Sequence, residues 1–128
     1  MFFAFIVFVG AGLGGVLRYA TNLAAIRLLG EAFPFGTFLI NVAGSFVMGL
    51  IAAAAVARIG FFGQPEWRLF LTTGVLGGFT TFSAFSLDAA YLWDRDEFGL
   101  AILYVGGSVA VSLAAVSAGL WLVRSLPG

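Results

Sequence analysis

The stretch Gly74-Val-Leu-Gly-Gly-Phe-Thr-Thr-Phe-Ser-Ala-Phe-Ser86 decides the fold of this chain. It lies in an uncharged run, Leu69 to Leu87, that is long enough to cross a bilayer. Glycine is a poor helix former, so the stretch predicts a break. A break at membrane depth is tolerated only inside protein or beside a water-filled cavity, and it often marks an ion or substrate site. The alternative is that the glycines permit close helix packing and the hydroxyls bond to their own backbone.

The composition indicates an integral membrane protein. Of the 128 residues, 62% are hydrophobic and 9% are charged, whereas a soluble domain carries about 25% charged residues. The chain has no cysteine and no histidine, which excludes disulfides, thiolate metal sites and the commonest general base. We therefore expect no enzymatic activity. The net charge of zero indicates no nucleic-acid partner, and no basic region precedes the first apolar run, which argues against a cleaved signal peptide.

The hydrophobic runs predict an all-α fold of four transmembrane helices in one domain. The third helix contains the break. Charged or proline-containing connections separate the runs, and the second and fourth runs exceed the ~20 apolar residues that cross a bilayer. The predicted helices span residues about 2–29, 35–57, 67–93 and 98–123.

The first span carries a misleading motif. Gly10, Gly12 and Gly15 fit the G-x-G-x-x-G dinucleotide fingerprint, but no alternation of strands and helices follows. Gly10 and Gly14 are better interpreted as a small-xxx-small packing face. Arg18 lies deep in the same span, so we expect it to face protein or water, or to extend to the membrane surface.

Polar side chains form a stripe on each of two other spans. Because residues four apart share a helix face, each stripe faces one direction. The middle residue of the first stripe is an amide near mid-membrane, which needs hydrogen-bond partners. It either joins helices or donates to a passing solute. The stripes are Thr37, Asn41 and Ser45 in the second span, and Tyr104, Ser108 and Ser112 in the fourth.

The basic residues are all arginines and are almost evenly divided between the two membrane sides. Orientation follows an excess of Lys and Arg on one side, and here there is almost none. We therefore predict insertion in both orientations and pairing with an inverted copy. One side carries Arg58, Arg68 and Arg124; the other carries Arg27, Arg95 and, if it reaches the surface, Arg18.

Three motifs together resemble the Fluc (CrcB-type) fluoride channel family, and the resemblance covers essentially the whole chain. The third motif is the most specific. Two departures are Ala84, where many relatives carry threonine, and Asp88, where some carry glutamate; the role of Asp88 stays open. The motifs are Gly14-Gly-Val-Leu-Arg18-Tyr19, Gly36-Thr37-Phe-Leu-Ile-Asn41-Val-Ala-Gly44 and Gly77-Gly-Phe-Thr-Thr-Phe-Ser-Ala-Phe-Ser86.

The resemblance implies a dual-topology, antiparallel homodimer in the plasma membrane, with two fluoride pores at the subunit interface. It further implies a structural sodium ion at the dimer centre, held by the main-chain carbonyls of Gly77 and Thr80 of each subunit. Asn41 would be the pore asparagine, Phe82 and Phe85 the paired pore phenylalanines, and Arg18 the vestibule arginine. The fourth-helix residues along the ion path would be Tyr104, Ser108 and Ser112.

The chemistry of these residues suits fluoride, which is small and holds its water tightly. The amide of Asn41 and the hydroxyls of Thr37, Ser83, Ser108 and Ser112 offer donors, and aromatic rings have positive edges. We expect passive export of fluoride, which reduces its toxicity. Two alternatives remain: a proton-coupled drug exporter, which needs a carboxylate in the membrane core, and a non-transporting membrane subunit.

Overall fold

The computed structural model describes residues 1–128, and every regular element in it is helical. Two short segments depart from α-helical winding: a 3-10 turn, η1, and a π-helical segment, η2. The elements in order are α1 (Phe2–Leu29), α2 (Phe35–Val56), η1 (Gly60–Gly63), α3 (Pro65–Leu69), η2 (Phe70–Leu76), α4 (Gly77–Phe79), α5 (Phe82–Asp94) and α6 (Phe98–Arg124).

Four stretches are long and apolar enough to cross a membrane: α1, α2, the interrupted span Pro65–Asp94 and α6. The prediction of an all-α membrane fold with a break in the third span is confirmed. Relative to the prediction, the second helix ends one residue earlier, the third span is longer at both ends, and the fourth ends one residue later. Helix ends fray, and their last turn is often of the 3-10 type, so a hydrophobic pattern places them only to within one or two residues.

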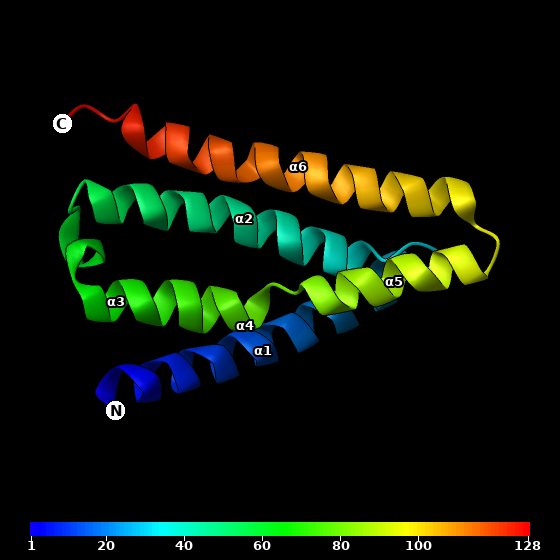
Figure 1. Ribbon diagram of the computed structural model, residues 1–128, viewed down its shortest axis with the longest axis horizontal. Coiled ribbons are helices and arrows are strands. Elements are labelled where there is room, and N and C mark those ends of the chain that lie inside the picture. The colour runs from blue at the N-terminus through cyan, green and yellow to red at the C-terminus, as the bar shows by residue number, and fades with distance from the viewer.

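The four spans lie side by side as an elongated bundle (Figure 1). α2 packs along α6, while α1 packs along η2 and α4. Both termini lie at one end of the bundle, together with the connection between α2 and α3 (Figure 1). Arg58, Arg68 and Arg124 therefore belong to that end, and Arg27 and Arg95 to the other.

The outer surface of the bundle is apolar. Only 21 of the 128 residues are buried, and large side chains such as Phe8, Val16 and Ile102 are exposed. A surface of this kind suits lipid tails or another protein rather than water. The chain is therefore a multi-pass membrane protein.

The break in the third span lies at Thr80 and Thr81, not at the glycines. Both threonines have extended backbone, with φ/ψ of −79°/157° and −154°/125°. Gly77 is helical, with φ −62° and ψ −38°. The glycine-based location was wrong because a helical glycine is tolerated where a neighbouring helix must approach closely.

That neighbour is α1. A Cβ atom on Gly14 would overlap the carbonyl oxygen of Val75, and one on Gly78 would overlap that of Ala11. A Cβ atom on Gly12 or Gly15, in contrast, would have no neighbouring atom within 4 Å. The packing interpretation of Gly14 is confirmed, and the glycines of the dinucleotide-like motif lie in a continuous helix rather than in a phosphate-binding loop.

Candidate functional site

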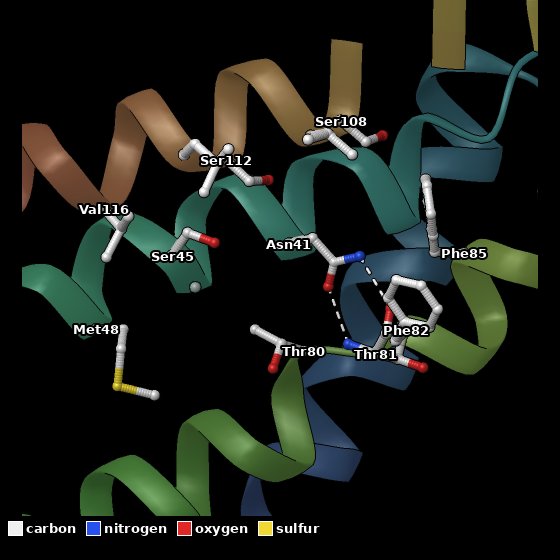
Figure 2. A pocket seen from close by; sticks show the side chains of 13 residues that line it. Asn41, Ser45, Met48, Thr80, Thr81, Phe82, Phe85, Ser108, Ser112 and Val116 are labelled. Atoms are coloured by element: carbon white, nitrogen blue, oxygen red, sulfur yellow. Dashed lines mark hydrogen bonds between the residues drawn. The ribbon is translucent and has the colours of Figure 1, made fainter. Parts of the chain in front are cut away.

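A cavity of about 390 Å³ lies beside the break, between α2, α6 and the start of α5 (Figure 2). Its polar atoms come from the break and from the two predicted stripes. Its apolar wall comes from the first turn of α5 and from the middle of α6. The lining residues are Asn41, Gly44, Ser45, Met48, Thr80, Thr81, Phe82, Phe85, Ser108, Val109, Ser112, Leu113 and Val116.

Asn41 spans the gap between α2 and the break. Its Nδ2 donates to the carbonyl oxygen of Thr81 at 2.9 Å, and its Oδ1 accepts from the backbone N–H of Thr81, also at 2.9 Å (Figure 2). An amide group has two N–H donors, so one hydrogen of Nδ2 is not used in this pair. Asn41 therefore joins helices and still has a donor beside the cavity.

The hydroxyls of Ser108 and Ser112 are buried and have no hydrogen-bond partner. On the same helix, the hydroxyl of Ser117 donates to the carbonyl of Leu113 at 2.8 Å, which is the usual arrangement for a serine in an apolar helix. A buried hydroxyl without a partner costs roughly 1–3 kcal/mol. Two of them on one wall of a cavity indicate that a polar ligand or water satisfies them there.

Aromatic rings form a continuous row that runs from the cavity into the core between α5 and α6. The ring centroids of Phe82 and Phe85 are 5.5 Å apart, and those of Phe85 and Tyr104 are 5.2 Å apart. Phe85 is 9% exposed and belongs to the core cluster of α5 and α6, whereas Phe82 is 78% exposed. The two phenylalanines, although three residues apart, therefore meet very different surroundings within one protein chain.

Tyr104 and Thr37 lie one helical turn before Ser108 and Asn41, outside the cavity lining. Tyr104 is fully buried and Thr37 is 4% exposed. The Tyr104 hydroxyl donates to Asp88 Oδ2 at 3.1 Å. Asp88 itself lines a second cavity, of about 420 Å³, near the loop that follows α1.

The break ends in an N-cap. Thr81 Oγ1 accepts from the backbone N–H of Ala84 at 3.2 Å and lies 3.3 Å from Ser83 Oγ. Threonine is a favoured N-cap because its oxygen satisfies an amide that the first helical turn leaves free. α5 thus begins at the cavity, and the N-terminal end of a helix carries partial positive charge.

The structure brings six of the predicted site residues to the cavity, and leaves five elsewhere. Ser83 is engaged at the cap, Gly77 is in α4, and Arg18 is half-buried on α1. The residues at the cavity are Asn41, Thr80, Phe82, Phe85, Ser108 and Ser112; those outside it are Arg18, Thr37, Gly77, Ser83 and Tyr104.

The site prediction left out two polar residues that line the cavity. Ser45 lies one turn after Asn41, and the four-residue spacing of the stripe already pointed to it. Thr81 provides both backbone partners of Asn41. No local pattern identifies that pairing, because the two residues are 40 positions apart in the sequence.

Comparison with known proteins gives a consistent result. A family model described as "CrcB-like protein, Camphor Resistance (CrcB)" matches residues 5–120. The chain is 60% identical over 121 residues to the fluoride-specific ion channel FluC 2 of Nitrobacter hamburgensis, covering 94% of this chain and 96% of the relative. It is 57% identical over 119 residues to the fluoride-specific ion channel FluC of Methylobacterium nodulans, covering 93% and 94%. The corresponding channel of Rhodopseudomonas palustris is 54% identical over 121 residues, covering 94% and 96%.

Proposed function

The chain belongs to the CrcB-like protein family, and on that premise we propose that it is a fluoride-selective channel that lets fluoride leave the cell passively. The observation that carries the proposal is the pair of buried, unpartnered hydroxyls of Ser108 and Ser112 on one wall of a cavity. The chain is not an enzyme, in agreement with the expectation from its composition. Its four spans lie in the plasma membrane.

The cavity offers donors and no acidic side chain, which favours an anion. Ser108 and Ser112 contribute hydroxyls, and Asn41 contributes the N–H that Thr81 does not use. The N-terminus of α5 adds partial positive charge at the same place. A small anion that has lost its water can be solvated by donors this close together, and the cost of leaving it unsolvated is high.

The ring edges of Phe82 and Phe85 extend this donor set, since the edge of an aromatic ring is positive. We propose that the path continues past Tyr104 and Thr37, the next residues of the two stripes. Ser83 would contribute through the cap of α5, and Arg18 would attract anions at the mouth. These roles follow the family resemblance together with the order of the residues along α1, α2, α5 and α6.

A proton-coupled exporter fits the structure less well. Such a protein needs a carboxylate exposed to its substrate in the membrane core. No Asp or Glu lines the cavity, and Asp88 accepts a hydrogen bond from Tyr104 outside it. A non-transporting subunit would not explain why two buried hydroxyls lack partners.

We further propose that two copies assemble antiparallel, with one pore on each side of the shared interface. The cavity opens to the outside of the single chain, and Phe82 beside it is 78% exposed. A second copy would cover this face and complete the wall. A cysteine introduced at Gly128 should be labelled from both membrane faces; labelling from one face only would contradict dual topology.

A structural sodium ion at the dimer centre is the third part of the proposal. The residues at the break fit such an ion, because sodium prefers oxygen ligands and the break leaves carbonyls without helical partners. In an uninterrupted helix the N–H of Thr81 would donate to the carbonyl of Gly77, but here it donates to Asn41. The carbonyls of Gly77 and Thr80 would hold the ion, which would supply positive charge near the two pores.

Fluoride efflux from liposomes that contain the purified protein tests the function directly. We expect rapid loss of fluoride and far slower loss of chloride at the same driving force. Equal efflux of the two anions would contradict selectivity, and no efflux from folded, correctly assembled protein would favour the non-transporting subunit.

A further inference from the structure

The side chain of Asn41 hydrogen-bonds the two backbone groups of Thr81. In a continuous helix these groups would bond the backbone of the same helix. Its carboxamide meets both polar groups of one residue, the N–H and the C=O of Thr81, each at 2.9 Å (Figure 2). The side chain that makes this double contact comes from the second turn of α2, whereas Thr81 separates α4 from α5. The pairing is therefore a tertiary contact that sets the backbone of the break.

These hydrogen bonds also decide which backbone carbonyls at the break lack a helical partner. A helix pairs each N–H with the carbonyl four residues earlier. Asn41 takes the N–H of Thr81, and Thr81 Oγ1 takes that of Ala84. The carbonyls that these two amides would otherwise bind are those of Gly77 and Thr80. Asn41 and the cap thus compete directly with the re-formation of a continuous helix through residues 77–84.

We propose that Asn41 is a positioning residue that holds the third span in its broken form, so that one side chain controls both the cavity and the carbonyls of the break. This role rests on the proposed function, in which the cavity is part of the ion path. We therefore expect removal of Asn41 to lower fluoride flux for two reasons, namely the missing donor and the altered break.

NMR of Thr81 distinguishes the two causes, because its amide reports the state of the break and not the missing donor in the cavity. An amide held by Asn41 Oδ1 is protected from exchange with deuterated water, and loss of its partner removes that protection. Asn41→Ala should therefore change the break in one of two measurable ways. If the break stays open, the exchange rate of Thr81 rises by about tenfold or more, the factor that corresponds to ~1.4 kcal/mol. If the helix re-forms, Thr81 N–H pairs with the carbonyl of Gly77, and the Cα chemical shifts of Thr80 and Thr81 move from extended to helical values. NMR of selectively labelled threonine measures the exchange rate and the chemical shifts, and Thr21 in α1 is an internal reference.

Asn41→Asp provides the second arm. Aspartate keeps an oxygen that accepts the Thr81 N–H but loses the donor to the Thr81 carbonyl and places negative charge beside the cavity. We expect Thr81 to stay protected to within about threefold of wild type while fluoride efflux falls severely. Asn41→Asp also tests the proposal if Asn41→Ala does not fold.

Ser108→Ala is the matched control, because it removes a cavity hydroxyl that has no bond to the break. It should lower efflux and leave exchange at Thr81 unchanged. Wild-type exchange at Thr81 together with wild-type, extended Cα shifts at Thr80 and Thr81 in Asn41→Ala would overturn the proposal and make Asn41 a cavity donor only. A change of exchange or of Cα shifts at Thr80 and Thr81 in Asn41→Asp as large as that in Asn41→Ala would overturn it too. The absence of fluoride efflux from the wild-type protein would contradict the proposed function and leave the exchange test intact.

Discussion

The two halves of the contact between α2 and α6 differ sharply, although small residues four positions apart occur in both. In one half, Gly49 and Gly119 bring the backbones together: a Cβ on Gly49 would overlap the carbonyl of Val116, and one on Gly119 that of Phe46. In the other half, Asn41 faces the serine stripe of Ser108 and Ser112 across a cavity. The first half is a packing interface, and the second is a polar space.

Spacing alone therefore does not distinguish packing from ion binding. What distinguishes the two halves is whether polar atoms are satisfied within the chain. The glycine half has no side-chain polar atoms to satisfy. The serine half retains two hydroxyls that do not bond back to α6, whereas Ser117 does.

The largest effect is expected in the glycine half. Gly119→Ala should strongly destabilise or abolish the fold, because the new Cβ meets backbone that cannot move without separating the helices. Overpacking of this kind costs about 1–3 kcal/mol or more. Size-exclusion chromatography and thermal unfolding in detergent measure it.

Gly106→Ala is the matched control on α6, because a Cβ there meets nothing within 4 Å. It should fold normally, with a gain of up to about 1 kcal/mol from helix propensity. Wild-type stability of Gly119→Ala would contradict the packing role of the glycine half.

The next effect concerns the aromatic row beside the serine half. Replacement of Phe82 or Phe85 by Ile conserves most of the apolar volume, and such changes are usually tolerated, but it removes the ring edge. We expect at least one of the two variants to lower fluoride efflux by about tenfold, or ~1.4 kcal/mol on the barrier.

The different surroundings of the two rings sharpen this test. Phe85 is 9% exposed, so its replacement should also reduce the stability of the single chain, while that of Phe82, 78% exposed in the single chain, should not. Wild-type efflux from both variants as folded protein would assign the rings to packing alone.

The sequence predicted the helices well because hydrophobic length and charged connections are local properties. It placed the break near Gly77, whereas the chain breaks at Thr80 and Thr81. That location depends on Asn41, which is distant in sequence and supplies the alternative hydrogen bonds. The helical state of Gly14 and Gly78 likewise depends on the approach of α1 to the third span.

The sequence likewise predicted only part of the candidate site. The stripe spacing placed Asn41 on one face of the second span and Ser108 and Ser112 on one face of the fourth, and the structure brings them to one cavity. Thr37 and Tyr104 follow the same spacing but lie one turn away from that cavity. Periodicity gives the face of a helix and not the depth at which a cavity ends.

A smaller effect is expected at the break itself. Thr80 Oγ1 donates to the carbonyl of Leu76 at 2.8 Å, a local bond that Thr80→Ala removes without changing the main-chain carbonyls that we propose bind sodium. We expect the sodium dependence of fluoride efflux to change by no more than about twofold, or ~0.4 kcal/mol.

Thr81→Ala provides the contrast, because it removes the cap of α5 at a cost of about 0.5–2 kcal/mol and favours a continuous helix. It should raise the sodium concentration needed for efflux more than Thr80→Ala does. The opposite order would argue against a cation held by main-chain carbonyls.

The most direct test of the ion path is the fluoride efflux rate of the double variant Ser108→Ala/Ser112→Ala, measured in liposomes against Ser117→Ala. The double variant removes only hydroxyls that lack partners, so unfolding stability should stay equal or rise. We predict a fall in efflux of about tenfold or more in the double variant, and wild-type efflux in Ser117→Ala. Equal efflux from the two variants would contradict the assignment of the serine half as the fluoride path.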